Sequence, residues 1–206
     1  MSLPIFDLTP QQLVLRLFAL FFIAAVHGAV VTGTAVALGD AGPRYDGRLS
    51  LNPFPHLDIL GSISAVLFAV GWTKPVAIDP AQLRPGRIGL ALIVMAATAA
   101  TLLGALALRL VRPLLLPLLP DTASALTFAL IEATMQLSLW FALINLLPLP
   151  CLTGGHLLTA IAPQWRDASW RSRLVVAALL VVLAAMGFVA KLFAPAYQML
   201  ASAILP

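Results

Sequence analysis

Four apolar segments dominate this chain of 206 residues, and each is long enough to cross a bilayer as a helix. The hydrocarbon core of a membrane is about 30 Å thick, which about 20 helical residues span. Hydrophobic residues make up 61% of the sequence and charged residues only 10%, whereas soluble domains average about 25% charged residues. We therefore predict an all-α polytopic integral membrane protein in the lipid bilayer, with one domain over residues 1–206. The predicted spans are residues 13–38, 88–110, 123–146 and 173–193.

The segments between the predicted spans carry weaker signals. Residues 57–72 are apolar but too short for a full span, which is typical of a re-entrant segment. Turn residues separate short β-type stretches within 40–55 and 73–83, so we expect a small β piece at the membrane surface.

The distribution of Lys and Arg predicts the orientation. The loops 39–87 and 147–172, counted with Arg173 at their boundary, contain eight basic residues, and the other side contains four. The positive-inside bias therefore places both large loops in the cytoplasm. The basic residues are scattered between apolar segments and form no basic face, which argues against a nucleic-acid partner.

Several short motifs follow one another between residues 20 and 160. An apolar helix carries a lone histidine, His27, and a loop rich in glycine and proline follows it. The later motifs are LGD at 38–40, LNPFPH at 51–56, HLD at 56–58, GWTKPV at 71–76, NLLPLP at 145–150 and LTGG at 152–155. In order and spacing they resemble the site-2 protease family of intramembrane zinc metalloproteases, in its compact bacterial form.

The resemblance implies a zinc site, but this sequence departs from it. A zinc hydrolase with H-E-x-x-H needs two histidines one helical turn apart and a glutamate base beside the first. His27 keeps the first position, whereas Gly28 and Val31 stand at the glutamate and second histidine positions. Thr153 stands where the family has its third ligand, an aspartate, and the family motif A-G-P-x-x-N is lost at residues 96–101. Because glycine takes no proton and valine binds no metal, we expect no catalytic residue, no zinc and only a residual ligand position at His27.

The resemblance then indicates a catalytically inactive pseudoprotease of the bacterial inner membrane. Such a protein would act by binding a membrane-protein partner, or as an accessory or structural subunit of a membrane complex. In active members the asparagine at the Asn145 position helps to hold the substrate backbone, so Asn145, Pro148, Pro150 and Gly154 are the candidate partner groove. A purely local role of Asn145 at the end of its helix is an equal alternative.

A second hypothesis keeps the enzyme. An active intramembrane zinc metalloprotease with non-standard ligands would combine His27 with His56, Cys151 and His156, since cysteine and histidine both bind zinc. Their spacings match no recognised ligand pattern. The simpler interpretation of His27 is a neutral side chain that forms hydrogen bonds to a neighbouring helix.

A third hypothesis rests on Glu132, the only acid inside a predicted span, with Gln136 one helical turn further on. Ionisable groups at such a depth are costly and face the protein interior or a cavity. The pair fits a structural contact between helices or, alternatively, a small transporter or proton conductor that uses Glu132.

Overall fold

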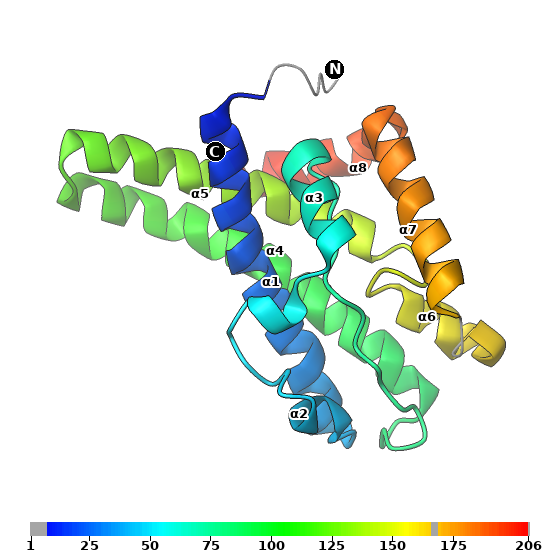
Figure 1. Ribbon diagram of the computed structural model, residues 1–206. Coiled ribbons are helices and arrows are strands. Elements are labelled where there is room, and N and C mark those ends of the chain that lie inside the picture. Colours follow the sequence, from blue (N-terminus) through cyan, green and yellow to red (C-terminus); the bar gives the residue numbers. More distant parts are fainter. Residues whose placement is uncertain (1–7, 166–168, 206) are drawn as a thin grey trace.

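The computed structural model describes residues 8–165 and 169–205, most of which are helical (Figure 1). The long helices are α1 (Pro10–Leu38), α4 (Arg87–Leu115), α5 (Asp121–Asn145), α7 (Trp170–Ala185) and α8 (Phe188–Ile204). The short elements are α2 (Gly42–Tyr45), η2 (Phe54–His56), α3 (Ile59–Phe68), η3 (Leu116–Leu118), α6 (Gly155–Ile161) and η4 (Pro163–Trp165).

Among the residues that the structure describes, three helices are long and apolar enough to cross a membrane: α1, α4 extended by η3, and α5. The pair α7 and α8 passes the same test together, but it is bent by 76°. The predicted fourth span, 173–193, is therefore divided between two helices. The bend lies at Gly187, whose φ of 73° is a left-handed conformation that glycine adopts without steric cost. The chain is an integral membrane protein with three or four spans.

Helix α1 crosses α4 and α5 near the middle of the molecule (Figure 1). Its start is fixed by a capping box, in which Thr9 and Gln12 bond to each other's backbone N–H groups, and by Pro10 in the first turn. Small side chains allow the helices to approach closely, as in other membrane bundles. The fully buried alanines of these helices are Ala19, Ala24, Ala35, Ala97 and Ala105.

The small β piece expected at the membrane surface is not formed, since the described residues contain one isolated antiparallel bridge, Leu57 to Thr73, and no strand. Arg48 gives a physical reason. Its guanidinium Nη1 donates to the carbonyls of Lys74 and Pro75 at 3.2 and 2.9 Å, so a side chain uses acceptors that a strand partner would need. Pro75 also lacks the N–H that a ladder requires.

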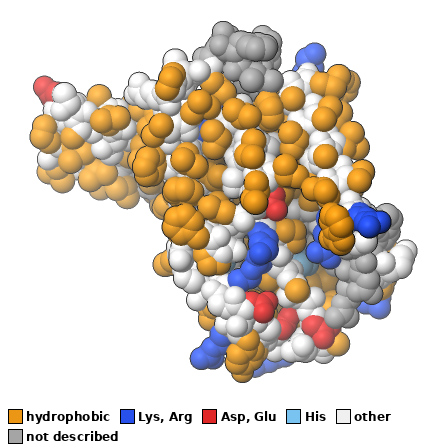
Figure 2. Space-filling view, viewed as in Figure 1, with side chains coloured by type: hydrophobic (Ala, Val, Ile, Leu, Met, Phe, Trp, Pro, Cys, Tyr) orange, Lys and Arg blue, Asp and Glu red, His pale blue; other side chains and the backbone are white. Residues whose placement is uncertain are grey.

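Hydrophobic and charged side chains separate on the surface. In the view of Figure 2, hydrophobic side chains cover the upper part and the arm formed by the α4–α5 hairpin. Charged side chains gather over the lower part, where Figure 1 places α2 and the neighbouring loops. This separation fits helices in lipid with one polar side at the membrane surface.

The shorter apolar segment becomes α3, a helix of 10 residues whose first turn packs against Trp72. A Cβ atom on Gly61 would overlap the backbone oxygen of Trp72, and backbone cannot move away as a side-chain end can. We expect Gly61→Ala to lower the free energy of unfolding by about 1–3 kcal/mol. The measurement is denaturant unfolding in detergent micelles. The matched control is Gly33→Ala, whose new methyl group meets only Leu49 Cδ1 at 3.8 Å; equal losses in the two variants would contradict the packing described.

Candidate functional site

The site is built around His27, which is fully buried in α1. Its Nδ1 lies 3.0 Å from Oγ1 of Thr101 on α4, and its Nε2 lies 2.9 Å from Oγ1 of Thr153 in the loop before α6. The ring meets Phe141 edge-on, with centroids 5.0 Å apart. Three parts of the chain that are distant in sequence therefore meet at one imidazole.

The directions of these hydrogen bonds follow from which atoms carry a hydrogen that they can donate. The Thr101 hydroxyl donates its single hydrogen to the backbone oxygen of Ala97 at 2.9 Å. Its oxygen can therefore only accept from His27, which requires a proton on Nδ1. The neutral ring then has its lone pair on Nε2, and the Thr153 hydroxyl donates to it. The nitrogen that could bind a metal is already used as a hydrogen-bond acceptor.

His56 occupies the space beside the position of the expected general base. A Cβ atom on Gly28 would overlap the His56 ring. The His56 Nε2–H donates to the backbone oxygen of Ser50 at 2.9 Å, which fixes the ring in this position. Burial also lowers the pKa of His56 below its ordinary value, so the ring is neutral at pH 7. A glutamate side chain cannot be added at residue 28 unless His56 moves.

The second histidine position of the expected zinc site is part of the hydrophobic core. Val31 packs with Leu90, Ile93 and Ala97 of α4 in one buried cluster. Within residues 8–165 and 169–205, no three His, Cys, Asp or Glu side chains form a group that could hold a metal ion. The side chains described around His27 therefore form no ready set of zinc ligands.

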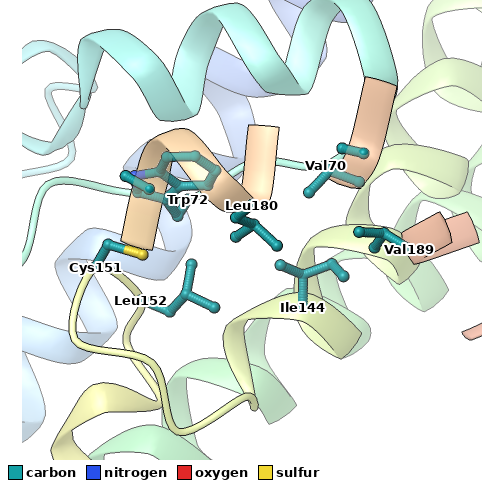
Figure 3. Packing of buried hydrophobic residues seen from close by; sticks show 9 residues of the cluster. Val70, Trp72, Ile144, Cys151, Leu152, Leu180 and Val189 are labelled. Carbon is teal, nitrogen blue, oxygen red and sulfur yellow. The ribbon is translucent and has the colours of Figure 1, made fainter. Parts of the chain in front are cut away.

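The other candidate zinc ligands lie in separate surroundings. Burial raises the pKa of the Cys151 thiol to about 11, so it is not a thiolate at neutral pH. Figure 3 shows Cys151 in an apolar cluster with Trp72 and Leu152. His156 lines a cavity together with Arg173; burial, assisted by this positive charge, lowers the pKa of His156 to about 4.

Asn145 connects the end of α5 to two other segments. It is fully buried, and its amide nitrogen donates to the backbone oxygens of Gly71 and Phe141, each at 2.9 Å. Its Oδ1 lies 3.5 Å from the backbone N–H of Thr153. A Cβ on Gly154 would overlap the backbone of Leu147, so glycine is needed for the tight turn after Thr153. Asn145 thus positions the loop that carries the second hydroxyl of the site.

The two large loops meet at a cavity of about 470 Å³. One wall comes from residues 75–80 and the other from residues 150–159, including Pro150. Pro148 is exposed and lies outside this lining. Two of the predicted groove residues, Asn145 and Gly154, are buried. They are not among the residues that line this cavity.

Glu132 has a charged partner. Its Oε1 accepts from Nη1 of Arg112 at 2.6 Å, and the Arg112 guanidinium also stacks over the Phe128 ring at 4.5 Å. This ion pair joins α4 to α5. Gln136 lies on the same side of α5 and is exposed.

The fold and the site define a helical membrane protein with one fully buried, hydrogen-bonded histidine at the meeting point of three segments. The chain belongs to peptidase family M50, whose family model matches residues 17–189. It is similar to the putative zinc metalloprotease YwhC of Bacillus subtilis (strain 168), with 29% identity over 142 residues. The match covers 67% of this chain and 64% of that relative, so this chain aligns with less than two thirds of the relative's length. No solved structure matches it significantly.

Sequence reasoning missed one residue and one contact of this site. In the sequence, Thr101 is notable only as the changed last position of the motif A-G-P-x-x-N. Its hydroxyl was the available signal for a new hydrogen bond. The contact between Gly28 and His56 was also missed. A glycine in the middle of an apolar helix was the available signal, because it indicates close approach of a neighbouring group.

The hydrogen bond from Thr153 to His27 can be tested with an isosteric variant. Thr153→Val keeps the shape of the side chain but leaves Nε2 buried without a donor, so we expect a loss of about 1–3 kcal/mol in the free energy of unfolding. The control is Thr159→Val, because the Thr159 hydroxyl only bonds to the backbone oxygen of His156 three residues earlier. Nitrogen-15 shifts of the His27 ring in the native protein should show the proton on Nδ1; a proton on Nε2 would refute the assigned directions.

Proposed function

We propose that this chain is a catalytically inactive member of family M50 that acts by binding a membrane-protein partner. The observation that supports it most directly is the use of the His27 Nε2 lone pair by the Thr153 hydroxyl. A zinc ion needs that lone pair and at least two further ligands. Val31 and Thr153, at the two remaining ligand positions, supply no histidine or carboxylate.

Peptide hydrolysis also needs a general base. In the metal-assisted reaction this base takes a proton from the attacking water. Gly28 cannot take a proton, and the His56 ring fills the space into which a longer side chain would extend. Loss of the metal ligands and loss of the base are thus two independent arguments for a binding function.

The cavity between the two large loops is the proposed partner groove. Val76 and Ile78 are buried and Ala77 between them is exposed, as in an extended segment with one side covered. Among the described residues, the backbone groups of these three form no hydrogen bond. Backbone groups without hydrogen-bond partners can pair with an extended segment of another protein. We place the groove at the cytoplasmic side, in keeping with the excess of Lys and Arg in these loops.

The metal content tests the inactive state. Protein purified without chelators should contain far less than one zinc per chain by elemental mass spectrometry, and a model peptide substrate should remain intact. His27→Gln, which keeps one donor and one acceptor, should leave the metal content unchanged. Zinc near one per chain that is lost in His27→Gln would show a metalloenzyme with other ligands and would overturn the proposal.

Site-specific photocrosslinking tests the partner groove. A benzoylphenylalanine at Ala77 should give one defined adduct with a membrane protein in the native membrane, in an amount comparable to that of this chain. The matched control is the same group at Leu51, which is 72% exposed and does not line the groove. Adducts of equal yield from both positions, or none from Ala77, would contradict binding in the groove.

A further inference from the structure

A second cavity lies between α1, α5 and α8, and we propose that it binds a phospholipid with an anionic head group. Its volume is about 790 Å³, within the range of pockets that hold small organic ligands. It is separate from the His27 site and from the groove between the loops, so the proposal does not depend on the absence of zinc. The side chains that carry the argument are Gln12, Arg16, Gln136, Trp140, Lys191 and Tyr197.

The polar side chains require a polar occupant. Gln136 lies in the span α5, and Lys191 lies in α8, yet both are exposed at this cavity. A polar group that faces hydrocarbon loses its hydrogen bonds, so such groups in membrane helices face a partner or a water-filled space. The cavity is far larger than one or two water molecules need. A ligand with a polar end satisfies these side chains.

The balance of charge favours an anion. Arg16 and Lys191 both line the cavity, and neither forms an ion pair with any described residue. The Arg16 guanidinium is held by the backbone oxygens of Val66 and Leu67, which use its Nη1 and leave its other N–H groups available. The one carboxylate, Glu132, is already paired with Arg112. The cavity therefore presents two cations that form no ion pair with a described carboxylate, an arrangement that suits a phosphate group.

The remaining walls suit acyl chains. Trp140 and Tyr197 stack with their ring centroids 4.5 Å apart, and this pair forms a flat apolar side of the cavity. Leucine and alanine side chains complete the lining: Leu15, Ala69, Ala129, Ala133, Leu137, Ala190 and Ala194. A ligand that matches both kinds of wall is an amphiphile.

The position along α1 agrees with a lipid head group. The cavity includes Thr9 and Gln12, at the first turn of α1. A spanning helix begins near the level of the head groups, where tryptophan and tyrosine are also enriched. The phosphate of a bound lipid would therefore lie at this end of the cavity, near Gln12 and Arg16.

Native mass spectrometry on the full chain in detergent tests the proposal, with phosphatidylglycerol and phosphatidylcholine of the same acyl chains as probes. The wild-type chain should bind phosphatidylglycerol more tightly. Lys191→Gln should weaken that binding about tenfold, the effect of losing one charged hydrogen bond. The fold should not change, because Lys191 is exposed and forms no ion pair with a described residue. Lys74→Gln removes the same charge from an exposed residue outside the cavity and should change nothing.

A second variant tests the acyl wall without a change in charge. Ala133→Leu places a larger side chain inside the cavity and should weaken the binding of both lipids. Equal binding of the two lipids by the wild-type chain, or equal effects of Lys191→Gln and Lys74→Gln, would overturn the proposal. Displacement of the lipid by an equal concentration of glycerol phosphate would also overturn it, because the acyl chains would then contribute nothing.

Discussion

The two hydrogen bonds of His27 are the constraint on which the centre of this structure depends. A polar ring in the interior of membrane helices has no water to bond with, so both of its nitrogens need protein partners. Thr101 supplies one from α4, and Thr153 supplies the other from the loop after α5. The ring therefore fixes the distance of α1 from both. Any variant that removes one partner leaves a buried polar atom unpaired, which costs more than the bond itself contributes.

The residues around His27 differ from those of a metalloprotease in a mutually consistent way. The Thr153 hydroxyl joins α1 to the loop before α6. Val31 completes an apolar cluster with α4, and Gly28 makes room for the His56 ring. A carboxylate at residue 28 would collide with the His56 ring. The helices of this chain pack on small apolar side chains, and such contacts do not depend on a metal.

Much of the fold follows from the sequence, because length and hydropathy suffice to identify α1, α4 and α5 as spans. The bend at Gly187 could not be predicted, since the apolar pattern continues through it and a positive φ leaves no trace in hydropathy. The β piece was predicted from extended stretches, but the Arg48 side chain takes acceptors that a strand needs. The family motifs predict which positions of a zinc site are changed, and this stays a prediction. The contact of Gly28 with His56 could not, because it joins residues from different segments in the folded chain.

Asn145 links the His27 site to the groove that we propose for a partner. Its amide holds Gly71, at the start of the segment that leads to Val76, and its oxygen faces the backbone of Thr153, at the start of the opposite wall. One buried side chain thus sets the separation of the two walls. A groove that is already in its binding shape loses less conformational entropy when a partner binds. The buried polar network thus keeps the two walls of the cavity in a fixed arrangement.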